Sequence, residues 1–307
     1  MLRFNQSGLG WPSEPERWMP RAMPNKVQSL FAFSALLFTL CASATPEAVS
    51  FNSLDGTLLK AWVFQPKDFA LTGTVIALNG CSGLYAGAGP RKVQLNGRHQ
   101  AMADLLVAEG YAVVFPDSLT PRGEAELCTQ KIDSRKISQT ERRADTLAAL
   151  AWVRVQPWAQ RATGGAPIAL LGWSHGGSAV LAATDAARAD VREQAPRPVV
   201  AIAFYPGCST SLKTNYQPSA PLLLMLGELD DWTPPGPCIA LGKSVGAEVN
   251  IFSGSHHGFD SPAGKVRRRT DVPDGATPGR GVHVGPNPAA REQAYARLRE
   301  VLRDAMK

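Results

Sequence analysis

The sequence lacks the closely spaced ligand pairs that are typical of zinc-binding proteins. Cysteine and histidine each occur five times in 307 residues, and neither a Cys-x-x-Cys nor a His-x-x-x-His pattern is present. We therefore expect no metal site. The sequence also has no internal repeat, and its longest uncharged apolar stretch, of about a dozen residues, is too short to span a bilayer comfortably. These absences argue against a zinc-binding module, a repeat protein and an integral membrane protein.

Positive charge is not concentrated enough to indicate a nucleic-acid partner. The chain is 19% charged and has a formal net charge of +6. Its basic cluster, Lys265 with Arg267–Arg269, is followed by Asp271 and Asp274 in a stretch rich in glycine and proline. We interpret this cluster as a solvated loop rather than a phosphate-binding patch, and we expect no nucleic-acid partner.

The N-terminal region has the pattern of a secretory signal peptide. Lys26 precedes the apolar stretch 29–40, and Ala42-Ser-Ala44 is a small-x-small cleavage pattern. We therefore expect residues 1–44 to be an extension plus signal peptide, and residues 45–307 to form a single exported domain. This domain would be periplasmic or secreted, with no stable membrane insertion after cleavage. The region before the signal is longer than a signal requires, so we expect translation to start at Met19 or Met23.

Four cysteines remain after this cleavage, namely Cys81, Cys128, Cys208 and Cys238. An even number in an exported chain suggests two disulfides. Cys81, Cys208 and Cys238 each follow a predicted strand. Of the three possible connectivities, we favour Cys81–Cys128 with Cys208–Cys238.

From about residue 47, short β-rich runs alternate with helical ones. This alternation predicts an α/β fold with a mainly parallel, twisted sheet flanked by helices on both faces. The runs 48–52 and 57–64 predict an antiparallel hairpin at the sheet edge. Further strands are expected at 73–78, 111–115, 166–171, 198–205, 221–227 and 247–252. Helices are expected at 96–109, 140–156, 178–184, 237–245 and 288–306, the last of them after a Pro/Gly-rich insertion, 261–287.

The segment Gly172-Trp-Ser-His-Gly-Gly177 lies between an apolar strand and a helix. In a strand-to-helix turn this sharp, the residue at the apex adopts strained backbone angles, and its neighbours must be small. Ser174 is therefore a candidate nucleophile, although a tight turn with a solvent-facing serine would have the same sequence. Such a serine needs a base and an acid, which in this architecture follow in the order Ser, Asp or Glu, His.

Both partners follow later strands. Asp230 comes after the strand 221–227, and His257 comes after the strand 247–252. Alone, such an acid would cap a helix and such a histidine would be polar surface. Because the carboxyl ends of parallel strands share one edge of the sheet, Ser174, Asp230 and His257 together predict a catalytic triad. The backbone amides of His175 and Cys81 are the expected oxyanion donors.

These motifs resemble the dienelactone hydrolase family of α/β-hydrolases. The resembling segments are 79–84, 117–123 with Cys128, 172–177, 204–208, 227–234 and 256–260. The resemblance implies the α/β-hydrolase fold and assigns the acid to Asp230 and the base to His257, with His256 as a neighbour. The lactone-cleaving members use a cysteine nucleophile supported by a glutamate in the early loop. Ser174 and Gly80 stand at those positions here, which leaves the substrate open.

The sequence thus predicts an exported serine hydrolase that cleaves ester or lactone bonds of a small molecule without a cofactor. The alternatives are a peptidase of the prolyl-oligopeptidase type and a non-catalytic exported binding protein with the same fold. Arg122, Trp173 and Trp232 are candidates for the substrate pocket or for structural roles, Arg122 by pairing with Asp117.

Overall fold

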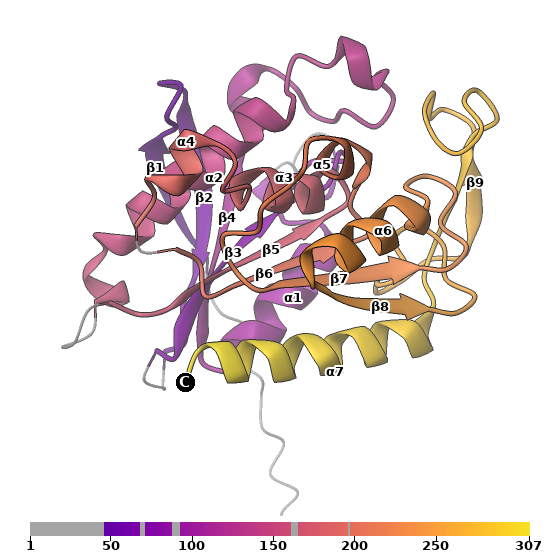
Figure 1. Cartoon of the computed structure of the whole chain (residues 1–307). Coiled ribbons are helices and arrows are strands. Elements are labelled where there is room, and N and C mark those ends of the chain that lie inside the picture. The colour runs from indigo at the N-terminus through magenta and orange to yellow at the C-terminus, as the bar shows by residue number, and fades with distance from the viewer. Residues whose placement is uncertain (1–45, 68–70, 88–92, 161–164, 196) are drawn as a thin grey trace, which may run out of the picture. The chain divides into compact units, whose positions relative to one another are not determined.

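The computed structural model describes residues 46–67, 71–87, 93–160, 165–195 and 197–307 (Figure 1). The expectations for the signal peptide, its cleavage site and the translation start lie outside these residues. No helix within the described ranges is both long and apolar enough to cross a membrane. These ranges lie in one compact unit, Ala42–Lys307.

In the described chain, the main sheet has eight strands in the order β1-β2-β4-β3-β5-β6-β7-β8. β1 and β2 form an antiparallel hairpin, and β2 also pairs antiparallel with β4, whereas all later pairings are parallel. The fold class and the edge hairpin are confirmed. The strands are β1 (Glu47–Asn52), β2 (Leu58–Phe64), β3 (Gly73–Leu78), β4 (Tyr111–Asp117), β5 (Ile168–Trp173), β6 (Val200–Phe204), β7 (Leu222–Gly227) and β8 (Glu248–Phe252).

Helices cover both faces of this sheet (Figure 1). α1 (Gly97–Ala108) and α7 (Pro288–Ala305) contribute to the core on one face, while α2 (Gln139–Arg154), α3 (His175–Ala183) and α6 (Pro235–Val245) contribute to the core on the other. β3 to β7 are buried along their whole length, because apolar side chains point from these strands into both layers. Two short helices, α4 (Ala189–Arg192) and α5 (Ser209–Lys213), lie in connections of the described chain.

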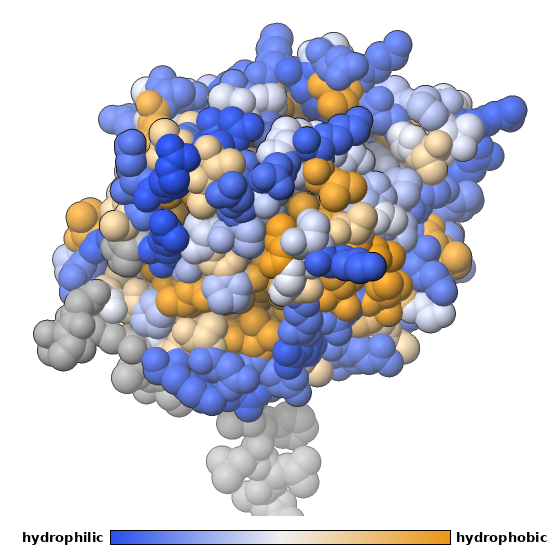
Figure 2. Space-filling model, in the orientation of Figure 1, coloured by the Kyte–Doolittle hydropathy of each residue, from blue (hydrophilic) through white to orange (hydrophobic). Residues whose placement is uncertain are grey.

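The last helix illustrates how the sequence pattern places a helix on the sheet. Ala290, Ala294, Leu298 and Leu302 of α7 recur at every fourth position and are buried. The outer surface over α7 is mostly hydrophilic (Figure 2). Burial of this apolar stripe against the sheet is therefore what holds the C-terminal helix in place.

The interpretation of the basic cluster as a loop was wrong. Arg267–Arg269 is a strand, β9, which pairs antiparallel with β10 (Val282–Val284). In the sequence, the arginines of a solvent-exposed two-stranded hairpin cannot be distinguished from those of a polar loop. The backbone is fixed by contacts that the sequence does not reveal, such as the bridge between Val284 and His257.

The two disulfides have the connectivity that was favoured from the sequence. Cys81 is bonded to Cys128, and Cys208 is bonded to Cys238. The first links the loop after β3 to the connection that precedes α2. The second links the loop after β6 to α6, with both sulfur-bearing residues buried.

Replacement of Cys208 and Cys238 together by alanine is expected to lower the free energy of unfolding by about 2–4 kcal/mol. The bond joins residues separated by 30 positions, so its loss frees a loop in the unfolded chain. Alanine leaves no unpaired polar group at these buried positions. Urea denaturation under oxidising conditions measures the change, and a midpoint equal to that of the wild type would contradict it.

Candidate active site

Ser174 stands at the apex of the turn between β5 and α3. Its backbone angles are φ 54° and ψ −117°, a conformation that side chains rarely adopt. The turn is possible because its neighbours are glycines: a Cβ at Gly176 would overlap the carbonyl oxygens of Leu78 and Asn79, and a Cβ at Gly172 would overlap the backbone of Gly176. The strained turn expected for a nucleophile is present at Ser174.

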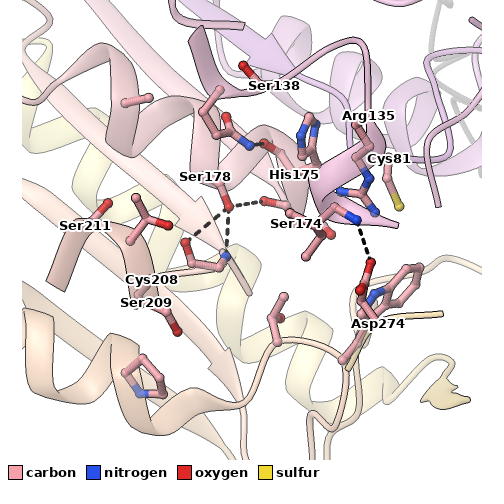
Figure 3. A pocket seen from close by; sticks show the side chains of 18 of the residues that line it. Cys81, Arg135, Ser138, Ser174, His175, Ser178, Cys208, Ser209, Ser211 and Asp274 are labelled. Carbon is pink, nitrogen blue, oxygen red and sulfur yellow. Dashed lines mark hydrogen bonds between the residues drawn. The ribbon is translucent and has the colours of Figure 1, made fainter. Parts of the chain in front are cut away.

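The turn that carries Ser174 is fixed to the next strand along the sheet. The Ser174 amide donates to the Phe204 carbonyl at the end of β6, at 2.9 Å, and the Ser178 amide of α3 donates to the Ser174 carbonyl at 2.9 Å. The Ser178 hydroxyl accepts from the Gly207 amide at 2.9 Å (Figure 3). Ser174 is thus held from both sides by backbone hydrogen bonds.

Asp230 and His257 form a hydrogen-bonded pair at the same edge of the sheet. His257 Nδ1 and Asp230 Oδ2 are 2.8 Å apart, and the exposed fractions of the two side chains are 6% and 1%. The other carboxylate oxygen of Asp230 accepts from the amides of Trp232 and Thr233 at 2.9 and 2.8 Å. Because a carboxylate only accepts hydrogen bonds, the proton lies on Nδ1 and Nε2 is the basic nitrogen.

Thr233 adds a hydroxyl to this pair. Its Oγ1 lies 3.0 Å from Asp230 Oδ2, 3.1 Å from His257 Nδ1 and 3.0 Å from the carbonyl oxygen of Tyr205. Its single proton can be donated to either of the two oxygens. The hydroxyl therefore connects the acid to the loop after β6.

The imidazole of His257 is in contact with two aromatic rings. The Tyr205 ring centroid is 4.6 Å away and the Trp232 ring centroid is 4.7 Å away. These contacts, together with the hydrogen bond to Asp230, restrict rotation of the imidazole. Tyr205 directly follows Phe204, which accepts the Ser174 amide, so the strand that holds the serine also supports the histidine.

Asp260 joins several of these segments from within the core. It accepts hydrogen bonds from Trp173 Nε1 at 2.8 Å and from the Tyr205 hydroxyl at 2.5 Å, and it forms an ion pair with Arg98 at 3.1 Å. Asp260 and Trp173 are completely buried. Trp173 therefore has a structural role and does not line the substrate pocket.

Arg122 is also structural, but its partner differs from the predicted one. It binds Asp145 through two hydrogen bonds of 2.9 and 2.8 Å and Asp55 through a third of 2.7 Å. Asp117 instead accepts the amides of Leu119 and Thr120 in the turn that follows β4. The side chain of this last residue of β4 is occupied by the turn that follows it, so it does not bind Arg122.

The residues of the two expected oxyanion donors, Cys81 and His175, line the same cavity as Ser174. Neither the Cys81 amide nor the His175 amide donates to an acceptor in the turns and loops of the described ranges. The loop that contains Cys81 is braced by its disulfide, by the Leu127 amide, which donates to the Cys81 carbonyl at 2.7 Å, and by buried Arg142, which donates to the Asn79 carbonyl at 2.9 Å. Amides held in this way are suited to stabilising a developing negative charge.

A cavity of about 760 Å³ opens above these groups. Ser174, His175 and Cys81 lie together on its wall (Figure 3), and Trp232 lines it as well. His257, whose ring is in contact with that of Trp232, is not among the residues that line the cavity. The structure describes both Ser174 and His257, and no hydrogen bond joins their side chains. Catalytic hydrogen bonds are often made only once substrate is bound.

Two other histidines, His175 and His99, have surroundings that make them poor bases. Burial, together with the positive charges of Arg142 and Arg135, holds the pKa of His175 well below its usual value of 6.5. Burial and the charge of Arg98 lower the pKa of His99 to about 3. Both imidazoles are therefore neutral and have no carboxylate partner, whereas His257 has one. This difference favours His257 as the base.

Tyr205, Thr233 and Asp260 were not predicted from the sequence to be part of the site. All three lie inside motifs that the resemblance had singled out, at 204–208, 227–234 and 256–260. An aspartate directly after the apolar pair Gly-Phe was the available signal, because an acid at such a position needs buried partners. Which partners it has depends on the packing of distant segments.

Comparison with solved structures places the fold among the α/β-hydrolases. A dienelactone hydrolase-like promiscuous phosphotriesterase from metagenomic libraries is similar with a TM-score of 0.61 and 17% identity, over 86% of this chain and 99% of that chain. Esterase 2 of Thermogutta terrifontis is similar with a TM-score of 0.53 and 16% identity, over 84% and 94%. The acylaminoacyl peptidase of Pyrococcus horikoshii has a TM-score of 0.55 and 17% identity, and the match covers 86% of this chain but 42% of the peptidase. At such identities the likeness concerns the fold alone.

No curated protein matches the sequence. The dienelactone hydrolase family does match it, over residues 93–306, which is more than half of the chain. This range contains Ser174, Asp230 and His257, and the resemblance noted from the motifs is thereby confirmed. The chain belongs to the dienelactone hydrolase family.

Proposed function

We propose that this protein is a serine hydrolase that cleaves carboxylic ester or lactone bonds of small molecules, with Ser174 as nucleophile, His257 as base and Asp230 as the acid that orients it. The observation that supports this most strongly is the buried Asp230–His257 pair, with Nδ1 and Oδ2 2.8 Å apart, at the sheet edge where Ser174 stands in a strained turn. Each part alone has other uses, but this combination suits nucleophilic catalysis.

In the proposed reaction, the Ser174 side chain turns toward Nε2 of His257 as substrate binds. His257 takes the hydroxyl proton while Oγ forms a bond to the substrate carbonyl carbon, and the carbonyl oxygen becomes an oxyanion. The amides of Cys81 and His175 donate to this oxyanion. The intermediate then expels the alcohol, which receives the proton from His257, and leaves an acyl-Ser174. Water attacks the acyl group by the same sequence and releases the acid.

The early loop differs from that of the lactone-cleaving members at Gly80, which stands where those members carry a glutamate. A side chain at Gly80 would begin 3.2 Å from the Trp173 carbonyl oxygen and 3.5 Å from Ser174 Cβ. A side chain at this position would be in tight contact with the turn that carries Ser174, and the loop has no glutamate of the kind that supports a cysteine nucleophile in those members. We infer that the serine works without such a group and that esters, as well as lactones, are substrates.

Export of the mature chain is part of the proposal. Two disulfides, Cys81–Cys128 and Cys208–Cys238, are typical of proteins that fold in an oxidising compartment. They add to the signal-peptide pattern before residue 45. We propose a periplasmic or secreted location for the domain 45–307.

A substrate panel tests the proposed activity. The purified domain is offered p-nitrophenyl esters of increasing acyl length, five- and six-membered lactones, and peptide p-nitroanilides. We expect turnover of the esters or lactones with kcat/KM well above that for the anilides, because the cavity of about 760 Å³ is of the size that holds small molecules.

Preferred cleavage of the peptide substrates would instead favour the peptidase alternative, for which the similarity in fold to the Pyrococcus enzyme is the supporting observation. Failure to turn over any substrate, by protein with the expected melting transition, would favour a non-catalytic binding protein.

A further inference from the structure

Three potential metal ligands meet beside the Asp230–His257 pair. Asp231 comes from the loop after β7, His256 from the loop after β8, and His283 from β10. Each offers one ligand atom, and these atoms all lie within 4.8 Å of one another. All three residues are partly buried. The proposed hydrolysis uses none of them.

The hydrogen bonds around the cluster prepare the imidazoles for coordination. His256 Nδ1 lies 3.0 Å from the Leu229 carbonyl oxygen. Because a carbonyl only accepts hydrogen bonds, Nδ1 of His256 carries the proton and Nε2 presents its lone pair. This arrangement, in which one ring nitrogen is fixed by a backbone oxygen, is the usual outer contact of a metal-binding histidine.

His283 is held toward the same point. Its Nδ1 lies 2.7 Å from Asp231 Oδ2, and its backbone amide donates to Asp231 Oδ1 at 2.7 Å. A bound ion would take the place of the proton between Nδ1 and Oδ2, and this proton would be released to water. The His256 and His283 rings lie next to each other, with centroids 5.3 Å apart. The carboxylate and the two imidazoles are therefore already assembled on one side of the hairpin β9–β10.

The neighbouring cations are directed elsewhere. Arg268 is the cross-strand partner of His283, and its guanidinium donates to the Arg280 carbonyl. Arg269 binds Asp271 at 2.7 Å and lies over the Trp232 ring. Neither arginine forms an ion pair with Asp231.

We propose that Asp231, His256 and His283 bind one divalent ion of the zinc type. Two imidazole nitrogens and one carboxylate oxygen suit Zn²⁺ and its neighbours Co²⁺ and Ni²⁺ better than they suit Mg²⁺ or Ca²⁺, which prefer oxygen ligands alone. The His283 and Asp231 side chains are 45% and 34% exposed, so water can complete the coordination. The absence of closely spaced ligand pairs, from which we expected no metal, does not exclude a site whose ligands come from three segments.

The ion would link the two loops that carry Asp230 and His257 of the proposed triad. Asp231 directly follows Asp230, and His256 directly precedes His257. The hairpin already contacts both loops, since the Ala276 amide donates to the Asp231 carbonyl at 2.8 Å and the Gly285 amide donates to the His257 carbonyl at 3.1 Å. A bound ion would fasten β10 to both loops at once. We therefore assign it a stabilising role.

Calorimetric titration with Zn²⁺ tests the site. The full-length mature chain is prepared without a polyhistidine tag and stripped with a chelator that is then removed. We expect saturable binding of one equivalent of Zn²⁺, a higher melting temperature on binding, and visible absorption bands from a Co²⁺–imidazole complex. These readouts do not depend on hydrolysis, so the site can fail while the proposed function stands.

Three variants separate this site from adventitious binding. His283→Gln and His256→Gln should each weaken Zn²⁺ binding at least tenfold and abolish the thermal shift. Asp271→Asn, which removes an exposed carboxylate from the same hairpin, should bind Zn²⁺ within twofold of the wild type. The proposal is overturned if the wild type does not bind Zn²⁺ saturably, if both histidine variants bind as the wild type does, or if the Asp271→Asn control loses binding equally. The two histidine replacements lie on different segments, so a folding defect in one leaves the other decisive.

Discussion

Replacing Ser174 by alanine is expected to reduce kcat for p-nitrophenyl ester hydrolysis on the order of 10⁶-fold, the loss observed when the serine of a Ser-His-Asp triad is removed. The variant has no atom that can form the acyl bond. The fold should be unaffected, because alanine meets the same backbone strain at φ 54° and the amide still donates to Phe204. Initial rates and the melting temperature measure the two effects.

A matched control for this experiment is Ser244→Ala. Ser244 lies on α6 and is not among the residues that line the cavity, and its hydroxyl donates to the Leu241 carbonyl of its own helix. Its activity should stay within about twofold of that of the wild type. If Ser174→Ala retains more than a few per cent of wild-type activity, another nucleophile is at work.

Replacing Asp230 by asparagine should lower kcat roughly 10⁴-fold with little change in stability. Asparagine keeps an oxygen for the amides of Trp232 and Thr233, so the turn after β7 should persist. Its other group donates a hydrogen bond toward His257 Nδ1, which forces the proton onto Nε2. The histidine then cannot take the proton from Ser174. Steady-state kinetics on the same esters, with circular dichroism of the folded variant, provide the measurement.

The comparison variant is Glu228→Gln, which changes a neighbouring acid. Glu228 accepts from the Ser253 hydroxyl at 2.7 Å and from the Gly254 amide at 2.8 Å, and no hydrogen bond joins it to His257. Its loss should alter kcat by less than about tenfold. Equal losses in the two variants would mean that Asp230 has no special role in orienting His257.

The sheet could be predicted from the sequence because its strands are short apolar runs separated by helical ones. β3 to β7 are completely buried, and such strands are recognised by composition alone. Element limits shifted by up to three residues, as at α3, which begins at His175 rather than at Ser178. The limits depend on capping and on tertiary contacts, which single residues do not encode.

The candidate triad was predictable for a topological reason. Ser174 directly follows β5, and Asp230 and His257 lie in the loops after β7 and β8. Strands that run parallel end at one edge of the sheet, so the three residues were expected at the same edge. The contacts of Tyr205 and Trp232 with the imidazole were not predictable. Their orientation depends on Asp260, on Thr233 and on the course of the backbone after β6.

The hairpin β9–β10 is the clearest case of tertiary context overriding sequence. Its arginines and glycines resemble a loop, and its strands have three residues each. Pairing is favoured by contacts with the loops after β7 and β8, among them the 2.7 Å bond from the His283 amide to Asp231. The same long-range contacts bring together the three ligands of the proposed metal site, which is why spacing along the sequence did not indicate it.

The most direct test of the account is to find which atom a fluorophosphonate modifies. The purified protein is labelled with the probe, digested, and mapped by mass spectrometry. We predict a single phosphonyl adduct on Ser174 and no adduct after Ser174→Ala. An adduct on a different residue, or ester hydrolysis by protein that never reacts with the probe, would contradict the assignment of Ser174 as the nucleophile.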